Sequence, residues 1–386
     1  MSFKHLFTRS LQAASGRLHM AAHSHHLWPD ASFAGQVACW EDAARLADAK
    51  WDRVMGEVWP EAQRHVAEEL GTGMPEAVVF AANTHDFLVR LAAAAPRNAG
   101  APLRVLTSDG EFHSARRQFA RWVESGDIAL TVIPRAPFDS LAERFVAAAG
   151  TGGHDLILVS QVLFGSGQPF VAIEDLAGLA DPKGPWVVID GYHSFMAIEA
   201  PFPAAVGDRA FYLAGGYKYA MAGEGMGFMH CPPGFGDRPP ITGWYAEFED
   251  LSLPSGMVGY AKDGMRFMGA TFDPSALYRF NAIRRMLAAE GLDTAAISAR
   301  VAALQARLVN AIAATPLGSA ELLNPLDQGL HARFLAFRSP DASRWQRTLK
   351  ERNCITDVRD DVLRVGLGLY HDEADIDEFA TLAATL

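Results

Sequence analysis

Short apolar runs alternate with helical patterns through the middle of the chain. Seven runs have the length and composition of buried strands, and segments with apolar residues three and four apart follow most of them. The strands are expected at 78–82, 104–107, 129–134, 156–162, 186–190, 211–214 and 226–230. Strands that alternate with helices predict a mostly parallel sheet covered on both faces. We therefore predict an α/β fold with a seven-stranded sheet in α/β/α layers.

The pattern is different at both ends of the chain. The first thirty residues show no regular pattern, and apolar spacing then predicts helices at 30–54 and 59–70. After residue 274, long helices at 275–290 and 294–314 precede short strands and helices, which predicts a smaller α+β domain. The boundaries we predict are 1–30 for an N-terminal segment that contributes to the active site and the small domain, 31–260 for a large cofactor-binding domain and 261–386 for a small C-terminal domain.

Composition excludes several classes of function. The 386 residues are 49% hydrophobic and 20% charged, with a formal net charge of −11 and no basic block, which argues against nucleic acid or an anionic membrane surface as a partner. No apolar run approaches the roughly 20 residues of a membrane span. Cys39, Cys231 and Cys354 are too scattered for a disulfide framework or a zinc site. Because the N-terminus also lacks a secretion signal, we expect a cytoplasmic protein.

Two neighbouring apolar runs each end in an ionisable residue. The run at 186–189 ends in Asp190, and the run at 210–214 is followed by two glycines, Tyr217 and Lys218. Ligands of open α/β sheets sit outside the carboxyl ends of the strands, so Asp190 and Lys218 are expected at one mouth. Pyridoxal phosphate needs a lysine for a Schiff base and an acid against its pyridinium nitrogen. An exposed turn lysine and a helix-capping acid are the plain alternatives.

Other strand ends offer further cofactor contacts. Asn83 and Thr84 open a helix directly after a strand, where free N–H groups bind phosphate, although Thr84 could also be a simple cap. Phe112 follows another strand and either lies against the cofactor ring or packs in the core. Ser160 and Gln161 end the strand LILVSQV and could contact the phenolic oxygen of the cofactor.

Arg364 and a histidine cluster complete the candidate residues. Arg364 stands among apolar neighbours in VLRVGLGLY and is either a partner for a substrate carboxylate or an exposed residue of an edge strand. His23, His25 and His26 lie close together in the chain, but no carboxylate or cysteine stands at ligand spacing. We therefore predict no metal site.

These elements resemble the class V aminotransferase group of fold-type I pyridoxal phosphate enzymes, and within it kynureninase. DGYHSF is similar to the family's D-x-x-H element, and GGYKYAMAGEG is similar to its lysine element. SQVLFGSGQPF resembles the strand and turn before the aspartate, and TDVRDDVLRVGLGLYHDEADID resembles the C-terminal segment of kynureninases. The resemblance covers nearly the whole chain and implies the aspartate aminotransferase-like fold.

The resemblance also implies a role for each candidate. Lys218 would form the Schiff base with pyridoxal 5'-phosphate, Asp190 would pair with the pyridine nitrogen and His193 would sit beside the phenolic oxygen. Tyr217 would contact the phosphate with Asn83 and Thr84. Phe112 would stack on the ring, and Arg364 would hold the α-carboxylate of an amino-acid substrate. Trp244 and Thr271 resemble positions that relatives contribute from the neighbouring subunit, which implies a homodimer.

The expected reaction follows from the residues present. Transamination requires only the core set, so we rank it above a kynureninase-type C–C hydrolysis or a β-elimination, which need further groups at Cβ. The segments AAHSHHLWP and GATFDPSA differ from the corresponding segments of kynureninases and leave the substrate open. A non-catalytic protein on this fold would be favoured by a missing lysine, and Lys218 is present. A nicotinamide enzyme would need G-x-G-x-x-G after a strand, which the chain lacks.

Overall fold

The central sheet has the predicted seven strands. The computed structural model describes residues 2–248, 252–327 and 329–386, and the sheet order is β2-β8-β7-β6-β5-β3-β4. The pairs from β7 to β4 are parallel, whereas β8 is antiparallel to both β7 and β2. The strands are β2 (Val78–Ala81), β3 (Leu103–Ser108), β4 (Ile128–Ile133), β5 (Leu156–Ser160), β6 (Trp186–Asp190), β7 (Phe211–Gly215) and β8 (Gly227–His230). The predicted mostly parallel α/β sheet is therefore confirmed.

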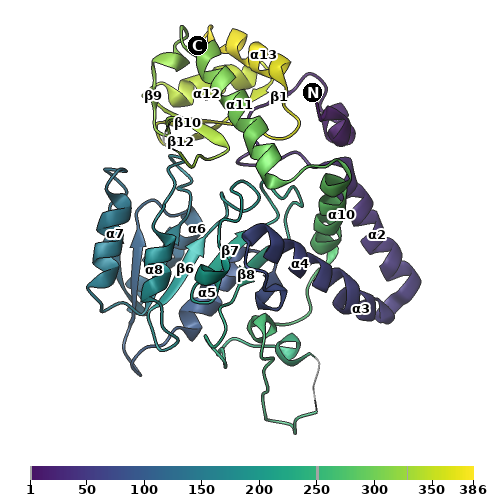
Figure 1. Cartoon of the computed structure of the whole chain (residues 1–386), viewed down its shortest axis with the longest axis vertical. Coiled ribbons are helices and arrows are strands. Elements are labelled where there is room, and N and C mark those ends of the chain that lie inside the picture. The colour runs from purple at the N-terminus through teal and green to yellow at the C-terminus, as the bar shows by residue number, and fades with distance from the viewer. Residues whose placement is uncertain (1, 249–251, 328) are drawn as a thin grey trace.

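Helices between the strands cover the sheet, as Figure 1 shows for the blue to teal part of the chain. They are α5 (Thr84–Ala94), α6 (His113–Glu124), α7 (Leu141–Gly150), α8 (Ile173–Leu179) and α9 (Ala204–Gly207). The central strands β5, β6 and β7 are almost entirely buried. Burial on both faces explains why these strands are continuous apolar runs and do not alternate with polar residues.

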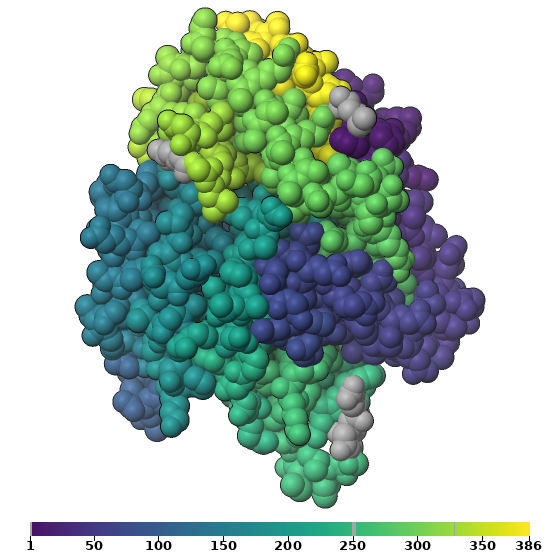
Figure 2. All heavy atoms as spheres, viewed as in Figure 1, coloured from purple at the N-terminus to yellow at the C-terminus, as the bar shows by residue number. Residues whose placement is uncertain are grey.

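The C-terminal part forms a second, antiparallel sheet of order β12-β13-β10-β9. Its strands are β9 (Glu321–Leu322), β10 (Phe334–Arg338), β12 (Asp357–Arg359) and β13 (Val362–Gly366), and its helices are α11 (Thr294–Ile312), α12 (Ala342–Glu351) and α13 (Glu373–Ala383). β12 was not predicted, because its three residues Asp-Val-Arg have no apolar pattern. Figure 2 shows this green to yellow part seated on the blue to teal part.

The first thirty residues are more regular than predicted. They contain η1 (Lys4–Phe7), α1 (Thr8–Gln12) and β1 (Leu18–His19), and β1 pairs in parallel with β11 (Cys354–Ile355). These elements were missed because β1 is only two residues long and its partner lies more than 300 residues away in the chain. The pairing ties the N-terminal segment to the C-terminal part. The domain boundaries at residues 30 and 260 stay a prediction.

The helix predicted at 30–54 is interrupted. α2 (Asp30–Leu46) ends at Ala47, whose φ of 48° lies outside the helical region, and η2 (Ala47–Ala49), α3 (Lys50–Arg53) and the π-helix η3 (Val54–Val58) follow before α4 (Trp59–Leu70). α2 packs on α10 (Ser275–Ala289) through Gly35, while Trp40 is 71% exposed. The apolar spacing therefore predicted the helix without identifying the face that packs against its neighbour.

None of the helices in the described part of the chain combines the length and the apolar character needed to cross a membrane.

Replacing Gly35 with alanine is expected to lower the free energy of unfolding by about 1–3 kcal/mol. A methyl group there would lie 2.6 Å from the carbonyl oxygen of Tyr278 and 2.8 Å from Cα of Arg279, and backbone atoms cannot move aside cheaply. This overpacking outweighs the roughly 1 kcal/mol that alanine gains over glycine in a helix.

Gly56→Ala is the matched control, because a Cβ at Gly56 meets no atom within 4 Å. Urea unfolding of the two variants beside the wild type measures the difference. Equal stability of the two variants would contradict the close packing of α2 on α10.

Candidate active site

One cavity of about 640 Å³ collects most of the predicted site residues. Its walls come from the carboxyl ends of β5 and β6, the starts of α5 and α6, the loop after β7, an N-terminal loop, and the strands β12 and β13. Among the residues that line it are Asn83, Thr84, Phe112, Ser160, Asp190, His193, Tyr217, Lys218 and Arg364. The cavity therefore lies where the sheet's strand ends meet the C-terminal part.

The sheet register brings the acid and the amine to the same cavity. Asp190 ends β6 and pairs with Leu213 of β7, and Lys218 follows three residues after the end of β7. The Nζ atom of Lys218 lies 2.5 Å from Nε2 of His193 and 5.0 Å from the centre of the Tyr192 ring. The alternative interpretation of Lys218 as an exposed turn lysine is thus wrong, because the side chain lines the cavity and contacts His193.

Burial sets the charge state of this pair. Burial and, after it, the nearby Arg364 guanidinium lower the pKa of Lys218 to about 7, while the negative charge of Asp190 opposes this decrease. Burial, followed by the positive charges of Lys218 and Arg364, also holds the pKa of His193 well below its ordinary value. His193 is therefore a neutral imidazole near pH 7, and an appreciable fraction of Lys218 is a free amine.

Asp190 is a carboxylate in need of a cation. Burial raises its pKa, while the N–H of Tyr192, 3.0 Å from Oδ1, and the amine of Lys218 oppose that rise. The N–H of Tyr192 is the single hydrogen-bond donor recorded for this carboxylate within the described residues. A protonated ring nitrogen would supply the missing positive partner.

The start of α5 forms an anion-binding wall. Asn83 caps the helix, and its side-chain oxygen accepts a hydrogen bond from the N–H of Asp86 at 3.0 Å. The first N–H groups of the helix, at Thr84 and His85, have no acceptor within the helix, and both residues line the cavity. Gly227 of β8 permits this arrangement, because a Cβ there would meet the backbone of Asn83 at 2.5 Å.

Phe112 and Tyr217 face the same space. Phe112 is 42% exposed, and its ring packs edge-on against Phe164 at 5.4 Å, so core packing is not its role. Lys218 Nζ lies 5.9 Å from the Phe112 ring centre. The hydroxyl of Tyr217 lies 3.0 Å from Nδ1 of His25.

Arg364 lies inside the C-terminal sheet, and the edge-strand alternative is wrong. β13 runs between β12 and β10, and Arg364 is only 3% exposed. Its guanidinium donates to a carboxylate oxygen of Asp357 and to the carbonyl oxygen of Phe164, while its buried Nε has no partner among the described residues. The Nε–H group of the guanidinium is therefore the donor left without a partner among the described residues.

Arg359 is a cavity residue that the sequence prediction missed. It stands in the cavity wall and donates to Asp357 at 2.6 Å. Burial alone would raise the pKa of Asp357, but His23 and Arg364 hold it far below its usual range. The spacing of Arg359 and Arg364 in the C-terminal motif could have identified Arg359, since β12 and β13 form an antiparallel pair.

Gln161 does not line the cavity, contrary to the prediction. Its side chain donates to the carbonyl oxygen of Pro201 at 2.7 Å and accepts from Ser194 at 2.6 Å on the opposite side of the strand end. Ser160 lines the cavity in its place. Neighbouring residues of a strand point to opposite faces, so only one of the two could reach the cofactor.

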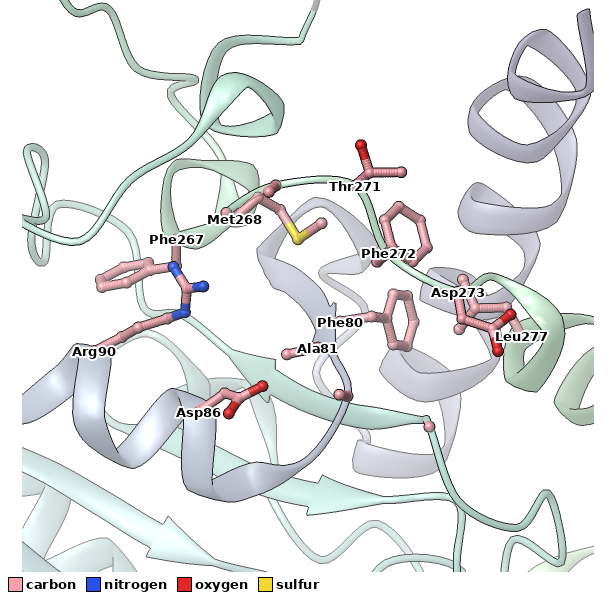
Figure 3. A pocket seen from close by; sticks show the side chains of 14 residues that line it. Phe80, Ala81, Asp86, Arg90, Phe267, Met268, Thr271, Phe272, Asp273 and Leu277 are labelled. Atoms are coloured by element: carbon pink, nitrogen blue, oxygen red, sulfur yellow. The ribbon is translucent and has the colours of Figure 1, made fainter. Parts of the chain in front are cut away.

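Trp244 and Thr271 also lie outside this chain's cavity. Trp244 is 42% exposed, and Thr271 is exposed at a second pocket of about 350 Å³. Figure 3 shows Thr271 at the rim of that pocket, with Arg90 and Asp86 of α5 across from it. Their predicted contact with the phosphate thus has no counterpart within one chain.

The three N-terminal histidines point to different partners. His23 stacks on Phe334 at 4.6 Å and is fully buried, His25 contacts Tyr217, and a ring nitrogen of His26 lies 2.7 Å from the carbonyl oxygen of Leu27. Within the described residues, no group of three or more potential metal ligands is arranged to hold an ion.

Comparison with known proteins agrees with this geometry. Residues 297–382 match the family model for the kynureninase C-terminal domain. A solved structure of C-DES with glycine covalently linked to its PLP cofactor is 15% identical, covers 100% of this chain and 99% of that chain, and has a TM-score of 0.80. The chain has the class V, fold-type I pyridoxal phosphate enzyme fold. The predicted resemblance is therefore confirmed.

Two further similar proteins are named for different reactions. The apo cysteine desulfurase of Thermococcus onnurineus NA1 is 17% identical, covers 100% of this chain and 98% of that chain, and has a TM-score of 0.80. Isopenicillin N epimerase of Streptomyces clavuligerus is 27% identical over 375 residues, which is 87% of each protein. The names span several reactions, so the fold alone does not assign one.

The residues present fit pyridoxal phosphate. Lys218 offers an amine, Asp190 offers a carboxyl group that makes no ion pair within the described residues, and the start of α5 offers free N–H groups. Phe112 offers a flat apolar surface on the same cavity. Each of these chemical requirements is met by a different wall of one space.

Lys218 is expected to react with acetic anhydride at a rate that rises as the pH increases through about 7, because the neutral amine is the nucleophile. Competitive labelling followed by peptide mass spectrometry measures the midpoint, with the exposed Lys350 as an internal reference for the reagent.

Arg364→Gln should move that midpoint to higher pH, because the substitution removes a positive charge that disfavours the ammonium form. A midpoint near 10 in the wild type, as for an unperturbed lysine, would contradict the buried environment.

Proposed function

We propose that the protein is a pyridoxal phosphate-dependent enzyme that transaminates an amino-acid substrate. The observation that carries the proposal is the amine of Lys218 beside the carboxylate of Asp190, in a cavity whose wall is the start of α5. A non-catalytic protein on this fold would not need a lysine with a pKa of about 7.

The chain's own residues divide the work among them. Bound pyridoxal phosphate supplies an electron sink for the negative charge that develops at the substrate's Cα. Asp190 would stabilise the positive charge at the ring nitrogen, and the N–H groups of Thr84 and His85 would hold the phosphate. Phe112 excludes water from one ring face, and Tyr217 adds a hydroxyl at the same wall.

Lys218 is the base of this scheme. Its amine would hold the cofactor's aldehyde carbon and, when free, would take and return a proton at the substrate's Cα. A pKa of about 7 suits both directions, because the group then gives and takes a proton with similar ease near neutral pH. His193, held neutral 2.5 Å away, keeps the amine oriented.

Arg364 positions the substrate through its α-carboxylate. The unpaired Nε supports this role, and Asp357 with Phe164 holds the guanidinium in place from its other edge. Arg359 on the same wall offers a second cation to an acidic group.

Cleavage at Cβ, by a kynureninase-type hydrolysis or a β-elimination, is the second candidate. The match of residues 297–382 to the kynureninase C-terminal domain favours it, and Phe112 with Phe164 gives the cavity an aromatic wall. Cysteine desulfuration is less well supported, because it needs a nucleophilic cysteine and all three cysteines lie outside the cavity.

The proposal includes a cytoplasmic homodimer. Trp244 and Thr271 are exposed and lie outside their own chain's cavity, where a partner chain could use them.

Purified protein with pyridoxal phosphate should absorb visible light and form a borohydride-reducible adduct on Lys218. Lys218→Ala should lose the adduct, and its turnover should fall by at least about 10²- to 10⁴-fold. Product analysis with a panel of amino acids then separates keto-acid release from ammonia, anthranilate or inversion at Cα. An adduct that persists unchanged in the variant would overturn the assignment of Lys218.

Arg364→Lys should raise KM for the best amino acid of that panel by about tenfold or more, with a smaller effect on kcat. The reason is that a charged hydrogen bond contributes about 1.5–3 kcal/mol, and lysine keeps the charge without the fork of donors. Arg359→Lys, measured by the same steady-state kinetics, is the control and should change KM less. A larger rise in KM for Arg359→Lys than for Arg364→Lys would place the substrate carboxylate at Arg359.

A further inference from the structure

A buried acid lies just behind the cavity wall. Glu111, in the loop between β3 and α6, is 0% exposed, and its two carboxylate oxygens accept hydrogen bonds from two serines. Ser108 Oγ lies 2.5 Å from Oε1, and Ser160 Oγ lies 2.5 Å from Oε2. The described residues contain no cation within ion-pair distance of this carboxyl group.

Only one of these serines reaches the cavity. Ser160 lines it at the end of β5 and is paired in register with Asp190 of β6. Ser108 lies outside the lining, and its oxygen also accepts the N–H of Gly110 at 3.1 Å. Glu111 is therefore a single hydroxyl group away from the cavity, on the side where Asp190 stands.

The carboxyl group can carry a proton at neutral pH. Burial raises the pKa of Glu111 to about 7 even though both serines stabilise its ionised form, and the negative charge of Asp190 raises it as well. Asp190 is the charged group that acts on Glu111 from the packed elements, and Ser108 and Ser160 are its polar neighbours.

The proton on Glu111 affects the cavity because a serine hydroxyl has only one hydrogen to donate. While Glu111 is ionised, Ser160 donates to it and presents only lone pairs to the cavity. When Glu111 is protonated, its O–H can be donated to Ser160, whose own hydrogen is then free to point into the cavity. Ser108 lacks this effect on a ligand because it does not line the cavity.

We propose that Glu111 is a positioning residue that acts through Ser160. Its proton decides whether the serine hydroxyl donates or accepts a hydrogen bond at the cavity wall beside Asp190. The inference rests on the proposed function for the identity of the group in the cavity. A donor stabilises a negative oxygen and an acceptor stabilises an N–H group, so the protonation of bound pyridoxal phosphate and of Glu111 are linked.

Three variants test the link by pH titration of the visible absorption of the protein loaded with pyridoxal phosphate. The wild type should show a component that titrates near pH 7, shifting the cofactor's apparent pKa by about 0.5–1 unit, the size of one neutral hydrogen bond. Glu111→Gln and Ser160→Ala should lack this component. Ser108→Ala, the matched control, should keep it at a higher pH, because Glu111 loses a donor that favours its ionised form.

Infrared spectroscopy of the cofactor-free protein gives a second readout. A protonated-carboxyl band should disappear as the pH rises through about 7 and be absent from Glu111→Gln. It should persist in Asp190→Asn with a midpoint at lower pH, because that variant loses the negative charge that raises the pKa of Glu111. Ser160→Ala and Ser108→Ala alone carry the decision if Glu111→Gln does not fold.

The outcomes separate the two proposals. Identical titrations of Ser160→Ala and the wild type, or loss of the component from Ser108→Ala as well, would overturn the inference. A normal cofactor adduct without any titrating carboxyl band would overturn this inference and leave the proposed function in place. A wild type with no cofactor absorption would overturn both the proposed function and this inference.

Discussion

The partial burial of the Lys218 amine beside other cationic groups is the constraint on which the rest of the site depends. A buried ammonium group beside the guanidinium of Arg364 is unfavourable, and the pKa of Lys218 accordingly falls to about 7. His193, 2.5 Å away, stays neutral for the same reason. The site therefore contains a free amine at neutral pH, which is what covalent attachment of an aldehyde cofactor requires.

Residues in and behind the cavity wall balance the charges around this amine. Asp357 neutralises Arg364, whose Nε has no partner among the described residues. Asp190, by contrast, has a backbone donor and no fixed cation. This difference separates the two ends of the cavity, and under the proposed function one end would hold a ligand carboxylate and the other a ligand cation.

The two sheets meet at the cavity, and each supplies what the other lacks. The parallel sheet brings strand ends and helix starts together, which favours a flat, phosphorylated ligand. The antiparallel sheet of the C-terminal part adds Arg364 and Arg359, and the N-terminal segment, tied to it through β1 and β11, adds His23. The cavity thus depends on the seating of one part on the other, which Figure 1 shows.

The sequence by itself determined the order of elements and most of the chemistry. Continuous apolar runs are typical of strands buried on both faces, and residues at the carboxyl ends of the parallel strands, including Asp190, Lys218 and Asn83, fall at one sheet edge. Tertiary structure decided the rest. The alternation of side chains at a strand end selected Ser160 over Gln161, and the pairing of β12 with β13 set Asp357 opposite Arg364 and brought Arg359 to the same cavity. The proton-carrying environment of Glu111 also required the fold, because burial and two serines from different strands create it. Contacts between residues far apart in the chain leave no periodic pattern, and only the packed molecule contains them.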